Sequence, residues 1–257
     1  MDLLIPTSPR DTTKFTGKAD AYALYRPKYP TQAIEEALSG LGDPKLLAIV
    51  DIGAGTGIGT QQLRDTGARA IAVEPNDDMR RVAAAAGLKT IAGHGEATNL
   101  PDECCDVVTI FQAFHWFATQ NALTEIRRIL RPGGRLAIIG NTRDDADAFS
   151  SGYGDFLEKA GERALWTNFG FSWSNVLGLL SENGFSGGRR KKFPWAQPLT
   201  VDGLLGRAHS LSYMPARTDR KYSPLINALQ KWHFQFADPA GFANLHFVTN
   251  VYLAEKQ

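Results

Sequence analysis

A glycine-rich segment directly after an apolar run is the part of this sequence whose residue types and spacing best suit ligand binding. The run at residues 46–50 has the length and branching of a buried strand, and Asp51 follows it. Parallel α/β sheets bind ligands at the carboxyl ends of their strands. Glycine has no Cβ, so its backbone can approach a ligand closely. We therefore predict a ligand-binding loop made by Asp51 and the alternating glycines Gly53, Gly55, Gly57 and Gly59.

Two classes of nucleoside cofactor use a loop of this kind, and the glycine spacing helps to separate them. The dinucleotide pattern G-x-G-x-x-G needs a third glycine that packs a helix against a strand. That position is Ile58 when the count starts at Gly53 and Thr60 when it starts at Gly55. The fit to a dinucleotide loop is therefore poor. A glycine-rich turn without a ligand is the remaining alternative, and the strand before it and the helical pattern after it argue against that alternative.

A second apolar run, at residues 70–73, ends at Glu74, which lies 21 residues beyond Gly53. A carboxylate at the end of the second strand can accept hydrogen bonds from both hydroxyls of a ribose. Glu74, with its neighbour Pro75, is therefore a candidate nucleoside contact in either cofactor class. It supports nucleoside binding without choosing between a nicotinamide and a sulfonium.

Three aromatic residues surround one histidine in residues 113–117, just after another predicted strand at residues 106–111. A sulfonium is a poorly hydrated cation, which aromatic faces and carbonyl oxygens stabilise. Histidine suits proton transfer near neutral pH, so His115 is our candidate general base, with a purely structural role as the alternative. The candidate cofactor contacts in this segment are Phe111, Gln112, Ala113 and Trp116.

These segments together resemble the class I S-adenosylmethionine-dependent methyltransferases. Asp51 and the glycines after it resemble motif I of that family, and a helix that ends in Leu130-Arg-Pro-Gly-Gly134 before a strand is a frequent family signature. The resemblance implies that the loop, including Ala54, cradles the amino-acid end of S-adenosylmethionine. It also implies that Glu96 and Ala97 meet the adenine ring, with a solvated loop carboxylate as the alternative for Glu96.

The amino-terminal residues 15–30 are similar to the start of type 11 domain proteins in the trans-aconitate methyltransferase-like group. In that group the segment folds over the mouth of the cofactor site as part of a lid. The resemblance makes Tyr22 and Arg26 candidates for closing on the cofactor and Tyr25 a candidate for contacting the substrate. A surface arm packed on the body of the protein is the alternative for each of them.

The 257 residues are enough for one α/β domain with a full core. We predict a Rossmann-like, seven-stranded, mostly parallel sheet with helices on both faces and a helical cap. We assign residues 1–42 to a lid arm, 43–142 to the cofactor-binding core and 143–257 to the remaining sheet elements, with a substrate cap inserted at about 196–240. The expected strands are 46–50, 70–73, 88–92, 106–111, 135–139, 189–195 and 245–253. The expected helices include one from residue 31 and others at 123–130, 153–166, 172–182, 201–213 and 225–236.

Insertions at the carboxyl edge of a sheet are where substrate caps form, because loops and lids around a rigid scaffold carry function. The segment from Ser210 to Tyr213 resembles the family's cap segment. We expect Arg207 and Tyr213, with Tyr25, to bind the substrate. The full set of cap candidates is Trp166, Trp173, Arg207, His209, Ser210, Tyr213, Arg217 and Arg220.

The composition excludes several other classes of protein. The 28 Lys and Arg residues balance 27 Asp and Glu residues, so the chain lacks the excess of positive charge that is typical of nucleic-acid-binding proteins. The basic run at 189–192 is explained by a solvated strand edge or a collar for a substrate anion. Cys104 and Cys105 are the only cysteines, and they suit neither an unstrained disulfide nor a metal site. We expect no metal and a reducing, cytoplasmic location.

No segment has the apolar length of a signal peptide or a membrane span, so we expect no membrane partner. The oligomeric state stays open. These features predict a methyltransferase that uses S-adenosylmethionine and a small-molecule acceptor, with a carboxylate or hydroxyl oxygen favoured.

The expected chemistry is in-line displacement, which depends on positioning because the departing thioether is neutral. A carboxylate acceptor is already ionised and needs an arginine clamp. A phenol, amine or enol would need His115 or a tyrosine to take its proton. The alternatives are a non-catalytic S-adenosylmethionine-binding scaffold or partner subunit, and a nicotinamide-dependent oxidoreductase.

Overall fold

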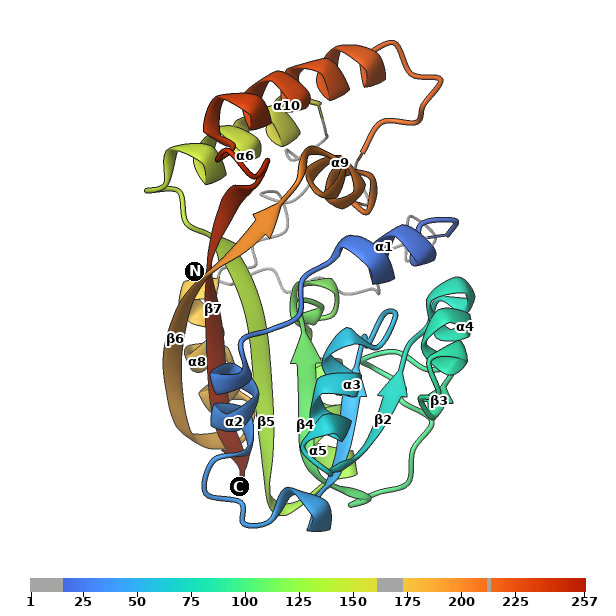
Figure 1. Cartoon of the computed structure of the whole chain (residues 1–257). Helices are drawn as coiled ribbons and strands as arrows, with labels where there is room; N and C mark the ends of the chain where they lie inside the picture. The colour runs from blue at the N-terminus through green and yellow to red at the C-terminus, as the bar shows by residue number, and fades with distance from the viewer. Residues whose placement is uncertain (1–15, 161–172, 212–213) are drawn as a thin grey trace.

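The central sheet has the order β3-β2-β1-β4-β5-β7-β6 within residues 16–160, 173–211 and 214–257, which this computed structural model describes. The first five strands run parallel, and β7 runs antiparallel to both of its neighbours. The predicted seven-stranded, mostly parallel sheet is therefore confirmed (Figure 1). The strands are β1 (Ala48–Ile52), β2 (Arg69–Val73), β3 (Thr90–Ile91), β4 (Cys105–Phe111), β5 (Leu130–Arg143), β6 (Phe185–Leu199) and β7 (Ala243–Lys256).

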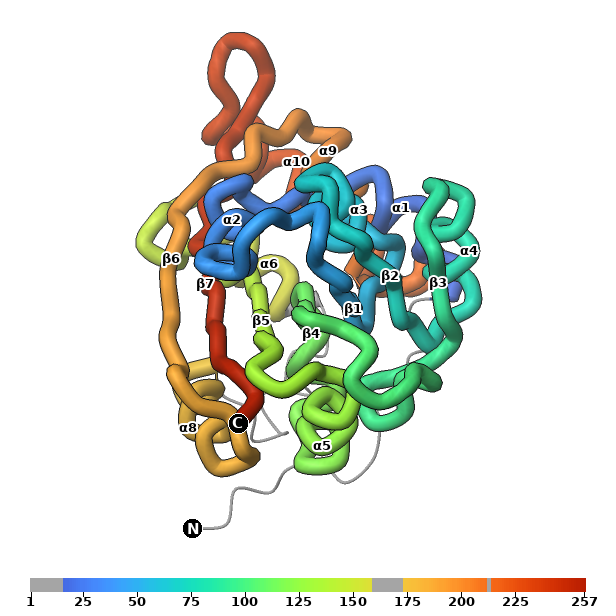
Figure 2. The backbone as a smooth tube through the Cα atoms, turned by 90° about the horizontal axis from the view of Figure 1, so that it is seen from below, coloured from blue at the N-terminus to red at the C-terminus, as the bar shows by residue number. Residues whose placement is uncertain are grey.

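Helices cover both faces of the sheet. The central strands β1 and β4 are buried along almost their whole length, which explains why each is a continuous apolar run in the sequence. One apolar cluster packs α2 and α3 against one face, and a second packs α5 and α8 against the other (Figure 2). The helices are α1 (Ala19–Tyr25), α2 (Thr31–Leu38), α3 (Ile58–Asp65), α4 (Asp77–Ala85), α5 (Gln120–Ile129), α6 (Ala148–Ala160), α8 (Val176–Glu182), α9 (Val201–His209) and α10 (Tyr222–Phe236).

A third apolar cluster lies beyond the carboxyl ends of the parallel strands. It joins α6, α9 and α10 to the parts of β6 and β7 that continue past the sheet (Figure 1). The helix α1 lies between α9 and the carboxyl edge of the sheet (Figure 1). The structure therefore puts helical segments from both ends of the chain over the edge where α/β sheets bind ligands.

Several predicted boundaries in the first half of the chain are wrong. The first strand starts at Ala48 rather than at residue 46, because Asp43 caps a short 3₁₀ turn, Pro44–Leu46, with its carboxylate 3.0 Å from the N–H of Lys45. The predicted strand 88–92 is reduced to the two residues of β3, which pair only with β2. The predicted strand 135–139 is longer, since β5 runs from Leu130 to Arg143.

The later helices also differ from their predicted ranges. The helix α6 begins five residues before the predicted start at residue 153, because Asp147 accepts hydrogen bonds from the N–H and hydroxyl of Ser150 at its first turn. A 3₁₀ turn, Trp173–Asn175, precedes α8. The helix α9 ends at His209, and α10 starts at Tyr222 with Pro224 in its first turn, where no N–H donor is needed. Residues 161–166, 172 and 212–213 of the predicted ranges lie outside the described residues.

The strands β6 and β7 are longer than the predicted strands 189–195 and 245–253, since both continue into the third apolar cluster. In the part of the chain that the structure describes, no helix is long and apolar enough to cross a membrane.

Candidate functional site

The glycine-rich loop leaves β1 and turns into α3 at the carboxyl edge of the sheet. Gly53 has a φ of 69°, in the left-handed region that glycine enters without a steric penalty. A Cβ added to Gly53 would lie 2.6 Å from the Cβ of Ala113. The N–H groups of Gly53 and Ala54 donate to the carbonyl of Val73 at 2.8 and 3.2 Å. The loop is thus packed tightly between the ends of β1, β2 and β4.

Asp51 lies beneath the loop and does not reach its outer surface. Its carboxylate is fully buried and accepts hydrogen bonds from the hydroxyls of Thr60 at 2.5 Å and Thr109 at 3.2 Å. Burial raises the pKa of Asp51 to about 7, and the charge of Glu74 adds to the rise. Because Thr60 belongs to α3 and Thr109 to β4, the carboxylate of Asp51 ties three elements together under the loop. This position favours a role in shaping the loop over direct contact with a ligand.

Asp51→Asn is expected to change the pH dependence of stability. The pKa of Asp51 is raised from 3.8 to about 7. In the pH window between these two values, the folded state retains a proton that the unfolded state releases. The wild-type protein therefore loses stability as the pH rises through the window, by about 1.4 kcal/mol per pKa unit. Asparagine resembles the protonated acid and does not titrate, so D51N escapes this loss. Urea unfolding across the window checks the result, and parallel profiles for the two proteins would contradict it.

Glu74 ends β2 directly beside the loop. One of its carboxylate oxygens accepts the N–H of Gly55 at 2.8 Å, and the other accepts the N–H of Asn76 at 2.9 Å. The side chain is only 6% exposed, and burial raises the pKa of Glu74. Each carboxylate oxygen has lone pairs beyond the one that these bonds use. Glu74 thus keeps acceptor capacity for a pair of hydroxyl donors.

The turn after Glu74 is held by a single arginine. Arg80 donates hydrogen bonds of 2.8 Å to the carbonyls of both Glu74 and Pro75. Asn76 then caps α4 by accepting the N–H of Met79 at 3.1 Å. Pro75 therefore contributes through its backbone to the orientation of Glu74.

Glu96 and Ala97 lie on a tight turn of the segment between β3 and β4. His94 and Ala97 exchange two backbone hydrogen bonds of 3.0 Å, which closes the turn. Glu96 accepts the hydroxyl of Thr119 at 2.6 Å, and Thr119 caps α5. The carboxylate of Glu96 is therefore anchored at the start of α5, near the end of β4.

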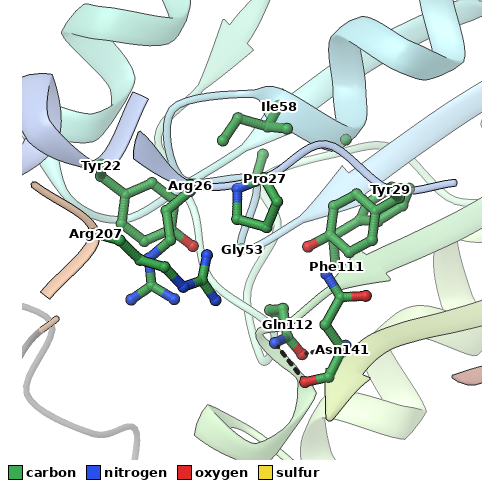
Figure 3. A pocket seen from close by; sticks show the side chains of 12 residues that line it. Tyr22, Arg26, Pro27, Tyr29, Gly53, Ile58, Phe111, Gln112, Asn141 and Arg207 are labelled. Atoms are coloured by element: carbon green, nitrogen blue, oxygen red, sulfur yellow. Dashed lines mark hydrogen bonds between the residues drawn. The ribbon is translucent and has the colours of Figure 1, made fainter. Parts of the chain in front are cut away.

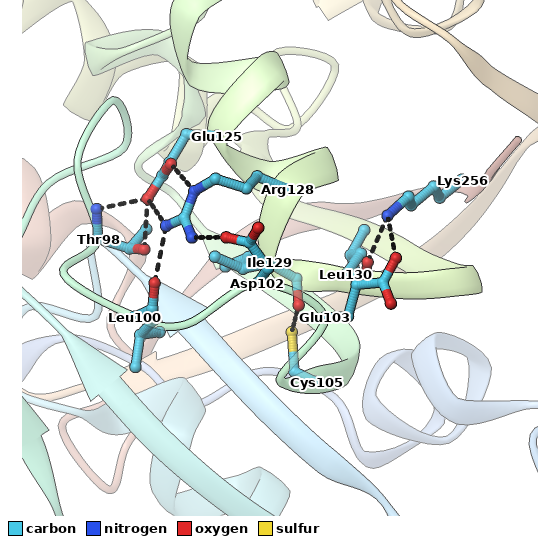
Figure 4. A network of polar contacts seen from close by, with 10 residues as sticks. All are labelled: Thr98, Leu100, Asp102, Glu103, Cys105, Glu125, Arg128, Ile129, Leu130 and Lys256. Atoms are coloured by element: carbon cyan, nitrogen blue, oxygen red, sulfur yellow. Dashed lines mark hydrogen bonds and ion pairs between the residues drawn. The ribbon is translucent and has the colours of Figure 1, made fainter.

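Two side chains of α5 hold the rest of this segment in place (Figure 4). Glu125 accepts both the N–H and the hydroxyl of Thr98, at 2.8 and 2.6 Å. Arg128 donates to the carbonyl of Leu100 at 2.8 Å and to Glu125 at 2.7 Å. Hydrogen bonding to Arg128 lowers the pKa of Glu125 to about 2. This ion pair fixes the segment that carries Glu96.

Gln112 is the first residue after β4, and its side chain makes the pairing with β5 that the backbone of a further strand residue would make. Its φ of 54° turns the chain away from the sheet. Its side-chain amide donates to the carbonyl of Asn141 at 3.0 Å and accepts the N–H of Asn141 at 3.0 Å (Figure 3). The side chain therefore satisfies the backbone groups of β5 that the departing strand leaves behind.

The other predicted residues of this segment face different surroundings. The ring of Phe111 packs 4.7 Å from the ring of Tyr29. Trp116 packs against the apolar cluster on the α5 and α8 face, and Ala113 belongs to that cluster. The ring of His115 lies 5.7 Å from Trp116 and 6.3 Å from Trp173.

A pocket opens where the amino-terminal segment, the glycine loop, the end of β4 and α9 meet (Figure 3). Several predicted residues line it, whereas Asp51, Ala113, His115 and Trp116 are not among the described residues that do so. The lining residues are Tyr22, Arg26, Pro27, Tyr29, Gly53, Ala54, Ile58, Gly59, Phe111, Gln112, Asn141 and Arg207.

Arg26 and Tyr25 join α1 to α9 at the edge of this pocket. Arg26 donates to the hydroxyl of Ser210 at 2.9 Å, and its guanidinium lies 4.8 Å from the centre of the Tyr22 ring. The Tyr25 ring packs directly on Gly206, where an added Cβ would lie 2.4 Å from ring atoms. Tyr25 thus contacts the α9 backbone, while Tyr22 and Arg26 line the pocket.

Arg207 reaches the pocket from α9. Its guanidinium lies 4.8 Å from the centre of the Phe247 ring and donates to the side-chain oxygen of Gln197 at 3.2 Å. The residue is 7% exposed, so these contacts are shielded from solvent. Arg207 and Arg26 therefore bring two guanidinium groups to one pocket (Figure 3).

The remaining cap candidates lie away from this pocket or outside the described residues. His209 pairs with the hydroxyl of Tyr222 at 2.7 Å, and burial, followed by the charges of Arg217 and Lys18, lowers the pKa of His209. Arg217 and Arg220 are exposed in the segment before α10. Trp173 stacks on Tyr252 at 6.0 Å. Tyr213 and Trp166 lie outside the described residues.

Tyr29 and Asn141 line the pocket but were not among the site residues predicted from the sequence. Burial raises the pKa of Tyr29 well above its ordinary value, so its phenol stays protonated. The side-chain amide of Gln62 brackets the Tyr29 backbone, with bonds of 2.8 Å to both its N–H and its carbonyl. The signal for Tyr29 was an aromatic residue between two prolines of the predicted lid. No local signal marks Asn141.

Comparisons with known proteins identify the family. Residues 50–138 match the methyltransferase domain family. The chain is 32% identical over 248 residues to an uncharacterized methyltransferase of Mycobacterium tuberculosis, Rv3342, which covers 94% of this chain and 96% of the relative. A demethylmenaquinone methyltransferase of Mycolicibacterium paratuberculosis is 33% identical over 164 residues, or 60% of this chain and 69% of that one. A solved S-adenosylmethionine-dependent methyltransferase of Thermotoga maritima gives a TM-score of 0.53 at 20% identity, covering 95% of this chain and 98% of that one.

The chain therefore belongs to the class I S-adenosylmethionine-dependent methyltransferases, and S-adenosylmethionine is its cofactor. Both predictions are confirmed. The residues present fit this cofactor. Glu74 is buried with spare acceptor capacity, and the hydroxyl of Thr56 in the glycine loop is buried without a hydrogen-bond partner among the described residues. Such groups suit a ligand that carries hydroxyl, ammonium and carboxylate groups.

Proposed function

We propose that this methyltransferase transfers the methyl group to an oxygen of a small carboxylate acceptor. The observation that carries the proposal is the pairing of Arg26 and Arg207 in one pocket beside Gly53 and Ala54. A guanidinium binds a carboxylate through two parallel, charge-assisted hydrogen bonds. Among the described residues that line this pocket there is no carboxylate or imidazole. An acceptor that is already ionised needs no such group as a general base.

The proposed roles follow from the position of each group. The glycine loop, Tyr22 and Glu74 hold the cofactor, and Glu96 and Ala97 lie where the segment before β4 would meet its adenine. S-adenosylmethionine supplies an electrophilic methyl group whose leaving group is a neutral thioether. Arg26 and Arg207 orient the acceptor carboxylate so that one oxygen faces that methyl group. Because no proton has to move, positioning by the arginines does most of the work.

Three other parts of the proposal rest on the sequence and its relatives. We propose that residues 1–42 act as a lid, 43–142 as the cofactor-binding core and about 196–240 as part of the substrate cap, to which Tyr25 and Tyr213 contribute. The name of one relative, demethylmenaquinone methyltransferase, supports an acceptor that is a small molecule. We also propose a cytoplasmic location, which the free thiols of Cys104 and Cys105 support.

Arg207→Met is expected to lower kcat/KM for a carboxylate acceptor by about 10- to 100-fold, because it removes charge-assisted hydrogen bonds worth about 1.5 to 3 kcal/mol. S-adenosylhomocysteine affinity should stay at the wild-type value. The measurement is S-adenosylhomocysteine release from S-adenosylmethionine across a panel of carboxylates, phenols and amines. Arg217→Met is the matched control, since Arg217 is exposed and does not line the pocket.

The same panel decides whether a base is needed. If the acceptor is a carboxylate, His115→Ala should leave ester formation largely intact. If wild-type protein methylates only phenols or alcohols, and His115→Ala abolishes that turnover, the carboxylate proposal is wrong and His115 is the base. If the Arg207→Met variant methylates carboxylates as efficiently as the wild type does, Arg207 has no part in acceptor binding.

A further inference from the structure

We propose that a network across β5, β6 and β7 positions Arg207, and that the hydroxyl of Thr249 is its central link. The proposal rests on the proposed function, because it treats Arg207 as the group that binds the acceptor. In it Thr249 and Trp195 are positioning residues, which act on the acceptor only through Arg207.

The groups that hold Arg207 directly come from two adjacent strands. Phe247 of β7 presents its ring face to the guanidinium at 4.8 Å, and Gln197 of β6 accepts its hydrogen bond at 3.2 Å. Phe247 is as well buried as Arg207, and a cation–π contact gains strength when both partners are shielded from water. Phe247 pairs with Trp195 of β6 and with Arg143, the last residue of β5. Beyond this point β6 and β7 continue toward α9 as a two-stranded extension, which carries Gln197 (Figure 1). The position of Arg207 therefore depends on how this two-stranded extension is held.

Trp195 and Thr249 hold the extension. Trp195 is the cross-strand partner of Phe247, and the two rings stack at 5.1 Å with an angle of 25°. The indole N–H of Trp195 donates to the hydroxyl of Thr249 at 2.8 Å. That hydroxyl in turn donates to the side-chain oxygen of Asn141 at 2.6 Å. Thr249 is fully buried, so water does not compete for either bond.

The network returns to the pocket at its other end. Asn141 belongs to β5 and lines the pocket, and its backbone is clamped by the side-chain amide of Gln112. The chain of contacts thus runs from one wall of the pocket, through Thr249, Trp195 and Phe247, to Arg207 on another. Among the side chains of the described residues, the Thr249 hydroxyl, which both donates and accepts, links Asn141 of β5 to the indole of Trp195. Loss of the Thr249 hydroxyl should therefore let the Arg207 guanidinium move relative to the rest of the pocket.

Thr249→Val tests the network because it removes the hydroxyl at nearly constant volume, whereas Thr249→Ser retains it. Labelling with phenylglyoxal, read by mass spectrometry, reports the accessibility of Arg207 without any acceptor. We expect labelling of Arg207 to be several-fold faster in T249V than in wild type, and the wild-type rate in T249S. Arg135, which is buried and paired with Glu255, is the internal control and should react equally slowly in all three proteins. An unchanged Arg207 rate in T249V would overturn the proposal.

Kinetics separate positioning from damage to the fold. T249V should raise the KM for the acceptor by about 3- to 10-fold, with a smaller change in kcat and an unchanged S-adenosylhomocysteine affinity. Faster labelling of Arg135, or an equal loss of S-adenosylhomocysteine binding, would show general damage and overturn the assignment. If T249V does not fold, Gln197→Met removes a direct contact of Arg207 and should accelerate its labelling in the same way. A wild-type protein that methylates no carboxylate would defeat the proposed function, while the labelling would still decide whether the network holds Arg207.

Discussion

Glu74→Gln is expected to weaken S-adenosylhomocysteine binding by about 100-fold or more, because two hydrogen bonds to a charged acceptor contribute about 1.5 to 3 kcal/mol each. The carboxylate is buried and already accepts the N–H groups of Gly55 and Asn76, so both of its oxygens are oriented before the cofactor arrives. Glutamine would present an amide N–H₂ to one of these donors. The variant therefore loses both the charge and the geometry of the site.

Calorimetric titration with S-adenosylhomocysteine measures the effect of this change. Glu35→Gln is the matched control, because it makes the same change at an exposed carboxylate of α2. E35Q should bind with wild-type affinity. Wild-type affinity in E74Q, with normal thermal unfolding, would exclude Glu74 from the cofactor site.

Gly53→Ala is expected to weaken cofactor binding by about 100-fold or more. Two penalties coincide at this residue. Its φ of 69° disfavours any side chain, and the new Cβ would lie 2.6 Å from the Cβ of Ala113, so the loop or the end of β4 has to move. Because Ala54 and Glu74 are placed relative to this turn, their geometry changes with it.

Gly87→Ala separates the two penalties. Gly87 also has a positive φ, of 80°, but an added Cβ would meet no atom within 4 Å. This control should lose about 1 kcal/mol of stability through its backbone alone and retain cofactor binding. Calorimetry and urea unfolding of both variants give the comparison. Equal cofactor affinities for G53A and G87A would show that the close approach at Gly53 has no part in binding.

The fold and the cofactor-binding loop could be predicted because their signals are local. A buried parallel strand requires a continuous apolar run, and a tight turn at its end requires glycine, so β1 and Gly53 leave a pattern within a dozen residues. Glu74 follows the next strand for the same reason. Boundaries were less predictable, since β5, β6 and β7 are extended by partners distant in the sequence and α6 begins at a cap supplied by Asp147.

The sequence by itself determined the class of protein, the cofactor and the edge of the sheet where the chemistry must occur, because backbone conformation and burial select residue types over short distances. Only the tertiary structure decided which side chains meet there. It brought Arg26 to Arg207, 181 positions away in the chain, and it directed His115 toward Trp173 instead of the pocket. These contacts depend on how α1 packs on α9 and on the antiparallel position of β7 between β5 and β6. Such long-range packing leaves no periodic trace around any one of the residues concerned.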